Sequence, residues 1–275
     1  MKDIKFGSRT YIMGILNVTP DSFSGDGIYQ DVNKAVEAAE KMVEDGADII
    51  DIGGESTRPG SKPITVEEEI KRTISVIKKL SKRINAPISI DTAKSEVARL
   101  ALENGASMVN DITGMESDQK MIGVVREFDA KVVLMHIKGA PQTMQDNPVY
   151  GDLLQEIKEK LRAIIEKAAA LGVKKENMIV DPGIGFGKTL EHNLRILNRL
   201  FEFKEFGLPV LVGPSRKSFI GKLTGAEPDK RIFGTIASVA IAIKNGADII
   251  RVHDVKEIKQ AVLVSDAITR SGVGI

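Results

Sequence analysis

Short apolar runs rich in β-branched residues recur along the chain, and stretches with helical periodicity separate most of them. The runs lie near residues 11–16, 48–52, 87–91, 106–110, 131–136, 177–181, 209–213 and 247–252. Between the fifth and sixth runs, apolar side chains at spacings of three and four share one helical face: Leu153, Ile157, Leu161 and Ile164. Strands that alternate with helices in this way predict parallel strand–helix–strand units.

A repeated signature precedes three of these strands. Residues 44–51, 103–110 and 244–251 each read as a helix end, a Gly-Ala pair and a short strand that finishes on a polar residue. Eight strands of this kind favour a closed (β/α)8 TIM barrel over an open doubly wound sheet. We expect residues 1–275 to form that barrel as a single domain, with the active site at the C-terminal ends of the strands.

Composition narrows the possible functions. The chain has 275 residues, close to the roughly 250 of a typical barrel of this class. A formal net charge of +1 without a basic stripe argues against a nucleic-acid partner. The absence of cysteine excludes disulfides, thiol catalysis and cysteine-bound metals, and it fits a cytoplasmic location. No apolar run approaches the ~18 residues of a membrane span, so we expect no membrane segment; the longest run, 236–243, predicts a buried helix face.

Three strands end in side chains that accept hydrogen bonds. The third ends in Asp91, the fourth in Asn110 and the sixth in Asp181. Each could instead cap the helix that follows its strand, as Asp and Asn often do. Three at one barrel rim favour a ligand site, because a buried carboxylate without a partner is costly. Since carboxylates only accept, they suit a ligand edge with two adjacent N–H donors, such as the 2-amino-4-oxo edge of a pterin.

A second group of side chains is cationic. Residues 215–218, Ser-Arg-Lys-Ser, follow the seventh strand, and Arg251 and His253 end the eighth. Arg251 and His253 are two positions apart and therefore point to the same side of the strand. Barrels often bind phosphate in the loops after strands seven and eight. A solvated charge cluster is the alternative, and the location favours an anionic ligand.

Two early loops are long, polar and rich in glycine. Residues 17–27 follow the first strand and residues 53–60 follow the second. Plain connections need fewer residues, so we expect these loops to close over the site as lids.

The loop after the sixth strand, Asp181–Lys188, joins an acid to a glycine-rich segment. Glycines let a flat ligand approach the backbone closely. Residues 183–189 superficially resemble a phosphate-binding loop, but the spacing is one residue short of the Walker pattern, which excludes that interpretation. No two histidines have metal-ligand spacing; His136 ends the fifth strand without an assigned role.

Taken in order, these motifs resemble the dihydropteroate synthase family nearly end to end. The resemblance is carried by residues 14–24, 53–60, 89–91, 109–111, 135–136, 181–188, 215–218 and 251–254. One departure is visible in the first loop. It reads Ser24-Gly25-Asp26-Gly27, where the family commonly has the aspartate directly after the serine, and Asp26 is therefore left without an assigned role.

The resemblance implies a fold, a reaction and a metal. Members are TIM barrels that join p-aminobenzoate to 6-hydroxymethyl-7,8-dihydropterin diphosphate. The products are 7,8-dihydropteroate, on the folate pathway, and pyrophosphate. The metal is Mg²⁺. These transferases are sulfonamide targets, because sulfonamides compete at the aminobenzoate site. Members are often homodimers, which makes a homodimer an expectation for this chain.

The resemblance also implies roles for individual residues. The pterin pocket would use Asp91, Asn110, Asp181 and Lys217, with Met135, Phe186 and Arg251 around the ring. The diphosphate would meet Asn17, Arg251 and His253, with Mg²⁺ near Asn17. The aminobenzoate site would be shaped by Thr57, Pro59, Phe186, Lys217 and Ser218. The closing loops would contribute Asp21 and Arg58. Catalytic roles are thus expected of Asp21, Arg58, Asp91, Lys217, Arg251 and His253.

Two other functions are compatible with a pterin-binding barrel. A methyltransferase that uses methyl-tetrahydrofolate and a corrinoid partner would share the strand-end aspartate and asparagine. It would not need the anion site at Lys217, Arg251 and His253, or the two long loops. A catalytically silent barrel that binds folate metabolites or a protein partner is disfavoured by the intact polar residues at every expected strand end.

Overall fold

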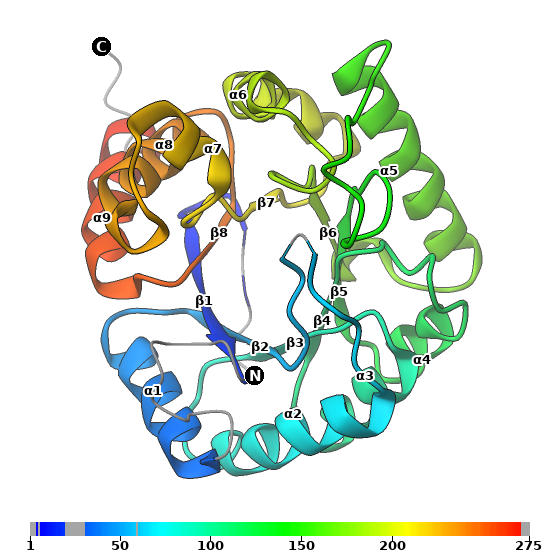
Figure 1. Ribbon diagram of the computed structural model, residues 1–275. Coiled ribbons are helices and arrows are strands. Elements are labelled where there is room, and N and C mark those ends of the chain that lie inside the picture. Colours follow the sequence, from blue (N-terminus) through cyan, green and yellow to red (C-terminus); the bar gives the residue numbers. More distant parts are fainter. Residues whose placement is uncertain (1–3, 5, 20–30, 59, 271–275) are drawn as a thin grey trace.

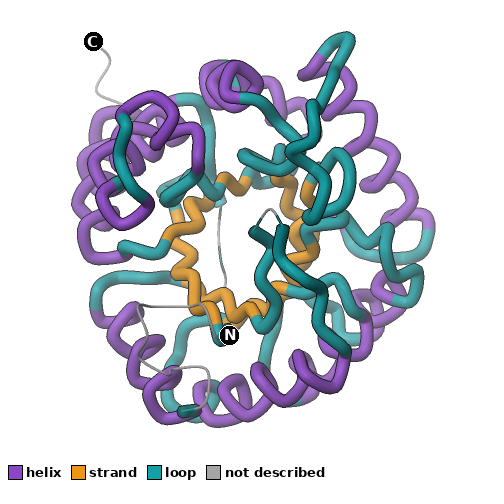
Figure 2. Tube along the Cα trace, viewed as in Figure 1, coloured by secondary structure: helices purple, strands orange, loops and turns teal. Residues whose placement is uncertain are grey.

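The described part of the chain contains one eight-stranded parallel sheet rolled into a barrel (Figure 2). The computed structural model describes residue 4 and residues 6–19, 31–58 and 60–270. The strands are β1 (Tyr11–Asn17), β2 (Ile49–Gly53), β3 (Ile88–Asp91), β4 (Met108–Asp111), β5 (Lys131–Met135), β6 (Met178–Asp181), β7 (Leu211–Val212) and β8 (Ile249–Val252). Their order in the sheet is β6-β5-β4-β3-β2-β1-β8-β7. The predicted (β/α)8 fold is confirmed.

Helices surround the ring of strands (Figure 1). They are α1 (Val32–Glu44), α2 (Val66–Leu80), α3 (Ser95–Glu103), α4 (Met121–Glu127), α5 (Leu153–Ala170), α6 (Leu190–Asn198), α7 (Ser218–Thr224), α8 (Ile232–Lys244) and α9 (Val255–Arg270). Short 3-10 turns are η2 (Lys175–Asn177), η3 (Leu200–Phe206) and η4 (Pro228–Lys230). None of the described helices is long and apolar enough to cross a bilayer.

The barrel closes between β6 and β7 with little backbone pairing. One isolated bridge joins Val180 to Val210, and the Val180 N–H donates to the carbonyl of Pro209 at 2.9 Å. Strand seven was expected over 209–213 but has only two residues, Leu211 and Val212. Pro209 begins the expected run and Pro214 directly follows it, and neither has the N–H that a ladder needs.

Inside the barrel, apolar side chains give way to polar ones toward the C-terminal ends of the strands. Successive inward positions are two apart, so Ile49 is followed by Asp51 on β2 and Ile249 by Arg251 on β8. The lower layer forms its own buried cluster, which includes Tyr11, Met13, Ile49, Met108, Val133, Ile179, Leu211 and Ile249. The apolar layer is the floor of the barrel, and the polar layer above it forms the candidate site.

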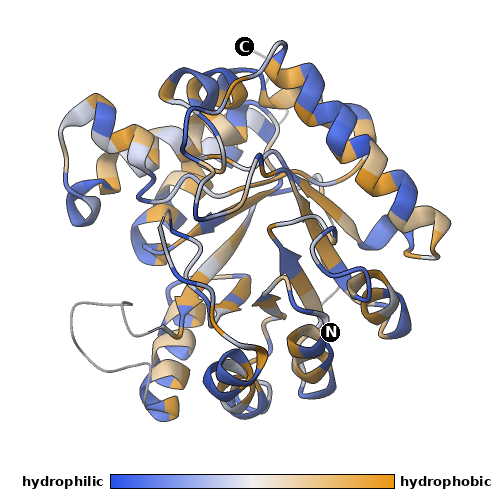
Figure 3. Cartoon of the chain, turned by 45° about the vertical axis from the view of Figure 1, so that its right-hand side comes forward, coloured by the Kyte–Doolittle hydropathy of each residue, from blue (hydrophilic) through white to orange (hydrophobic). Residues whose placement is uncertain are grey.

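A larger core lies between the sheet and the helices. Outward strand residues such as Ile50 and Ile52 are fully buried against the helices. In Figure 3 the strands are mostly hydrophobic, whereas the helices mix both kinds of residue along their length. The run 236–243 on α8 fits the predicted buried face only in part: Val239 and Ala242 are fully buried, but Ile241 is 51% exposed.

Candidate functional site

The carboxyl ends of four strands meet in one buried polar network. Arg251 donates hydrogen bonds from Nε to Asp51 Oδ2 and from Nη2 to Asp91 Oδ2, both at 2.6 Å. The side-chain amide of Asn110 donates to the same Asp51 oxygen at 2.9 Å. Burial raises the pKa of Asp91 to about 7, although the Arg251 charge lowers it. The structure therefore brings Asp91, Asn110 and Arg251 together around Asp51.

Asp181, at the end of β6, lies in the field of the Lys217 ammonium. Its Oδ1 accepts a hydrogen bond from the Gly183 N–H at 2.7 Å. Burial raises the pKa of Asp181 to about 6, while this hydrogen bond and the Lys217 charge lower it. Burial and the Arg251 charge lower the pKa of Lys217 to about 8. Acids and cations at the barrel mouth thus influence one another directly.

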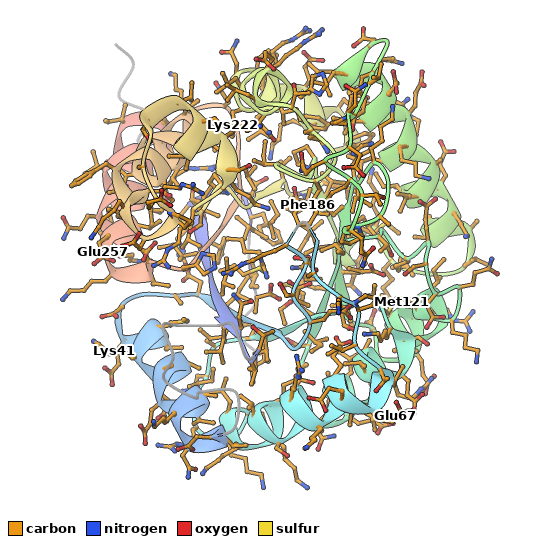
Figure 4. All side chains as sticks on the ribbon, in the orientation of Figure 1. Lys41, Glu67, Met121, Phe186, Lys222 and Glu257 are labelled. Carbon is orange, nitrogen blue, oxygen red and sulfur yellow. The ribbon has the colours of Figure 1, made fainter. Side chains whose placement is uncertain are left out.

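An aromatic face lies beside these charges. Lys217 Nζ stands 4.0 Å from the centroid of the Phe186 ring, which is cation–π distance. Phe186 is labelled near the centre of the barrel mouth in Figure 4, whereas Lys41, Glu67 and Glu257 lie at the periphery. Met135 ends β5, is 3% exposed and is the register partner of Asp181. A planar ligand could pack against these apolar groups while its edge meets the acids.

His253 is held by Ser215, a residue that sequence reasoning placed in a motif without giving it a role. The Ser215 hydroxyl lies 3.0 Å from His253 Nδ1 and accepts the His253 backbone N–H at 3.2 Å. Burial, with the charges of Arg216, Arg251 and Arg58, lowers the pKa of His253 to about 3. Burial therefore favours the neutral ring in the empty site, and an anion-binding role for His253 stays a prediction. Since Nδ1 can accept the Ser215 proton, Nε2 is left to donate to an anion.

Arg216 does not join this anion site. Its guanidinium forms an ion pair with Asp254 through both Nη2 and Nε, the latter at 3.1 Å from Asp254 Oδ2. Its backbone has a φ of +56°, and the Thr235 hydroxyl accepts its N–H at 3.2 Å. Of the two cations in the predicted 215–218 motif, it is Lys217 that lies in the field of Asp181 and Asp91.

The first part of the β2–α2 connection, which we call loop two (residues 54–58 and 60), is tightly fixed where it leaves the barrel. Arg72 donates from Nη1 to the Gly54 carbonyl at 2.9 Å. Lys94 pairs with Glu55 and, at 2.5 Å, with Glu69, whose side chain is 1% exposed. Beyond Glu55 the loop is more open, because Thr57 is half-buried and Arg58 is exposed. Loop two therefore has a rigid base and an open tip, with Figure 1 showing it over the barrel mouth.

The glycine-rich β6–α6 loop packs without space against the β5–α5 connection. Gly183 has a φ of +72°, and a Cβ there would stand 1.9 Å from the His136 carbonyl oxygen. Behind the loop, buried Lys188 lies 3.0 Å from His136 Nδ1 and donates to the Phe186 carbonyl at 2.9 Å. Burial lowers the pKa of Lys188 to about 7 and that of His136 to about 3. His136 and Lys188 thus support the loop that carries Phe186.

Fewer contacts define the positions of the remaining predicted residues. Asn17 ends β1, and a Cβ on Gly53 would stand 3.6 Å from both Asn17 Oδ1 and Asp91 Cβ, so these two side chains flank Gly53. Ser218 is exposed at the start of α7. Asp21 and Pro59 lie outside the described residues.

A cleft of about 960 Å³ opens beside the network. It runs between loop two, the β3–α3 loop and α4, and its lining includes Thr57, Asp91 and Ile112. It reaches the network at Asp91 and does not extend to Asp181 or Lys217. The hydrogen-bond network, rather than this cleft, marks the centre of the candidate site, because the charged groups converge there.

Sequence reasoning gave no site role to Asp51 or Lys188. Asp51 was noted only as the polar end of the repeated signature 44–51, and in the structure it lies inside β2, between Ile50 and Ile52. An acid flanked by isoleucines in a buried strand is itself a signal, because such a carboxylate needs a partner. Lys188 was noted as the end of the glycine-rich loop 181–188 and as part of a rejected phosphate-loop pattern, without a role of its own.

Comparison with known proteins agrees with this geometry. A family model described as pterin binding enzyme matches residues 13–253. The chain is 50% identical over 266 residues to the dihydropteroate synthase of Synechocystis sp., covering 96% of this chain and 92% of the relative.

Solved structures of the same kind are also similar. Clostridium difficile dihydropteroate synthase, crystallised in the presence of pteroic acid, has a TM-score of 0.92 and 49% identity, with 98% of this chain and 100% of that chain covered. The Yersinia pestis dihydropteroate synthase in a sulfonamide drug complex has a TM-score of 0.92 and 42% identity, with 96% of each chain covered.

A parallel barrel with acids, an amide and cations gathered at its C-terminal rim defines a pterin-binding barrel enzyme. Within that class, this chain belongs to the dihydropteroate synthase family. The resemblance stated from the order of its motifs is confirmed.

Proposed function

We propose that this protein condenses 6-hydroxymethyl-7,8-dihydropterin diphosphate with p-aminobenzoate, giving 7,8-dihydropteroate and pyrophosphate in folate biosynthesis. The observation that carries this proposal is the joint presence of acceptors and cations at one barrel mouth. Asp91 and Asp181 face Lys217 and Arg251 there, in a chain of the dihydropteroate synthase family. The protein would act as a single domain over residues 1–275.

In this proposal the pterin edge binds to the acceptors. Asp91, Asn110 and Asp181 take the N–H groups, and each hydrogen bond to a charged acceptor contributes about 1.5–3 kcal/mol. Lys217 donates to the ring, while Phe186, Met135 and the Arg251 plane enclose it. Support comes from the shared location of the acceptors and from the apolar faces of Phe186 and Met135 beside them.

The diphosphate would be bound by Arg251, by the neutral Nε2–H of His253 and by the amide of Asn17. Mg²⁺ would complete this subsite. Among the described residues no cluster of three His, Asp or Glu side chains suits a metal ion. Mg²⁺ bound through substrate phosphates needs only one or two protein oxygens, and the Asn17 amide oxygen is of the right kind. When bound, Mg²⁺ would neutralise charge on the leaving diphosphate.

The aminobenzoate would lie between loop two and α7. Thr57, Pro59 and Ser218 would shape its pocket, and its ring would pack on Phe186 near the Lys217 ammonium. The exposed Arg58 lies close enough for its charge to lower the pKa of His253, which supports a position beside the diphosphate subsite. Arg58 and Asp21 would close the two loops over the bound substrates.

An aryl amine is a weak nucleophile, so departure of the leaving group would carry much of the reaction. The bond from the pterin methylene carbon to the diphosphate oxygen breaks, and its electron pair goes to that oxygen, where Arg251 and His253 stabilise the charge. The methylene becomes cationic beside Asp91. The amine lone pair then forms the C–N bond, and the amine proton leaves to pyrophosphate or solvent. Closed loops exclude water, which would otherwise capture the cation.

The decisive experiment incubates the pure protein with the dihydropterin diphosphate and Mg²⁺, with and without p-aminobenzoate, and follows dihydropteroate and pyrophosphate. Product that forms only with the aminobenzoate supports the proposal. Tight pterin binding without product would contradict it, and a corrinoid partner would be supplied next to test the methyltransferase alternative.

We also propose that the protein is a cytoplasmic homodimer. Apolar side chains on the adjacent helices α8 and α9 support a second copy as the partner: Phe233, Ile241, Leu263, Val264 and Ile268 are each 51–81% exposed. A set of exposed apolar residues on neighbouring helices is typical of an interaction surface. The cysteine-free sequence suits the reducing cytoplasm.

A further inference from the structure

Asp51 connects two site residues that come from different sides of the barrel. Its side chain is fully buried on β2, and one oxygen, Oδ2, accepts both of its hydrogen bonds. The donors are Asn110 Nδ2 on β4, at 2.9 Å, and Arg251 Nε on β8, at 2.6 Å. Neither β4 nor β8 is adjacent to β2 in the sheet, so the contacts cross the barrel interior.

The chemistry of these groups fixes how the Asn110 amide is turned. An ionised carboxylate only accepts hydrogen bonds, and the NH₂ group is the only donor of an asparagine side chain. Asn110 must therefore direct Nδ2 down to Asp51, because the alternative would oppose two oxygen atoms. Its carbonyl oxygen is then the end left for a ligand, at the level of its register partner Asp91.

From this contact we infer that Asp51 is a positioning residue that sets the donor–acceptor specificity of the pterin pocket. The inference rests on the proposed function. An asparagine amide that is free to turn can offer a ligand either a donor or an acceptor, since its two ends have nearly the same shape. Held by Asp51, Asn110 offers only an acceptor. Together with Asp181 it therefore selects a ligand edge made of N–H donors.

The state of the other Asp51 oxygen supports a functional role over a purely structural one. Within the described part of the chain, Asp51 Oδ1 has no hydrogen-bond partner, and neither has the hydroxyl of Ser89, its register partner on β3. Buried polar atoms without partners oppose folding. An isoleucine or leucine at position 51 would suit the barrel core better, so the carboxylate is explained by its action on Asn110 and Arg251.

A double-mutant cycle tests the inference. The four proteins are the wild type, Asp51→Leu, Asn110→Ala and the double variant, because leucine removes the acceptor that asparagine would keep. The ligand is 6-hydroxymethylpterin, which lacks the diphosphate and so leaves Arg251 only its contact with the ring. We expect Asp51→Leu alone to weaken binding about tenfold, because the amide of Asn110 can then turn. In the Asn110→Ala background the same change should weaken binding by less than about threefold, since its effect passes through Asn110.

A second readout compares the pterin with its 2-oxo analogue, in which an acceptor replaces the 2-amino donor. Wild type should prefer the pterin, and Asp51→Leu should reduce that preference, because the freed amide can serve either ligand. A loss of packing alone would weaken both ligands equally and leave the preference unchanged.

Asp248→Leu is the matched control. Asp248 is also a buried aspartate, 2% exposed, but it lies before β8 at the opposite rim, where it pairs with Lys204 at 2.5 Å. It should lower stability without changing pterin preference. Additive effects in the cycle together with an unchanged preference would overturn the role of Asp51. If the wild type binds neither pteridine, the proposed function itself fails.

Discussion

At the residue scale, the site combines three strand-end acceptors that the sequence predicted with one buried acid, Asp51, whose role the sequence did not indicate. Asp91, Asn110 and Asp181 were found because they end apolar strands, and the structure places them at the barrel mouth. Asp51 was given no site role, because its importance depends on Arg251, which is 200 positions away along the chain. The lowered pKa of His253 was also beyond the sequence, since it depends on burial and on three arginines from separate segments of the chain.

The raised pKa values of the acids predict a pH dependence of pterin binding. Ligand N–H groups need ionised acceptors, so protonation of the empty site competes with the ligand. Because the pKa is about 7 for Asp91 and about 6 for Asp181, affinity should be full above this range and fall with decreasing pH. Below pH ~6 each of these groups should reduce affinity by up to about tenfold per pH unit. Calorimetric titration of 6-hydroxymethylpterin across this range measures the effect.

The matched variant for this titration is Asp181→Asn, which cannot ionise. We expect weaker pterin binding by this variant at neutral pH and a shallower loss of affinity toward acid. A pH profile as steep as that of the wild type would remove Asp181 from the pocket.

Glycine at position 183 is required by the packing of the β6–α6 loop. Gly183→Ala would put a Cβ 1.9 Å from a backbone oxygen, and a backbone atom cannot turn away as a side chain can. Gly225 has the same φ of +72° but nothing within 4 Å, so Gly225→Ala isolates the strain of the left-handed backbone, about 1–2 kcal/mol. We expect Gly183→Ala to lower the free energy of unfolding by a further ~1–3 kcal/mol in urea denaturation. Equal losses in the two variants would show that the loop can relax.

At the element scale, the sequence predicts where the strands lie. It does not predict how extensively neighbouring strands are hydrogen-bonded. Apolar runs located all eight strands, because an inward and outward period of two and β-branched residues are local signals. Strand β7 is shorter than predicted because Pro209 and Pro214 restrict its hydrogen-bond ladder. A prediction based on apolar residues alone does not include this effect of proline. The anchoring of loop two also escaped the sequence, since Lys94 and Glu69 come from elements that follow it.

The base of loop two should control turnover more than pterin affinity. Lys94→Met would release Glu55 and leave Glu69 buried without its cation, so loop two would lose its fixed base. We expect kcat to fall by about tenfold or more while the affinity for 6-hydroxymethylpterin changes by less than about threefold, because a misplaced lid mainly affects the closed state.

The double variant Lys94→Met with Glu69→Gln separates this effect from a general loss of stability. It removes the uncompensated buried charge and should recover much of the unfolding free energy, yet turnover should stay low because Glu55 is still unpaired. Recovery of turnover along with stability would contradict a positioning role for Lys94.

At the scale of the whole molecule, the exposed apolar residues of α8 and α9 predict a homodimer. Charged substitutions on this surface should dissociate it. Phe233→Asp combined with Ile241→Asp should convert the proposed dimer to a monomer in light scattering, because burying two carboxylates opposes association. Leu171→Asp is the control: Leu171 is 47% exposed at the end of α5, which Figure 1 shows across the barrel from α8 and α9. A wild-type mass equal to one chain would refute the dimer.

The sparse pairing of β6 with β7 should make this part of the barrel open locally more often than the rest. Amide hydrogens near Val180 and Val210 should exchange with deuterium sooner than those between β1 and β2, where five register pairs hold the strands. Asp181 ends one side of this join and Lys217 follows the other, so a pterin held by both would bridge it. Substrate should therefore slow deuterium uptake at this join more than elsewhere, completing the ring of strands where its own backbone bonds are fewest.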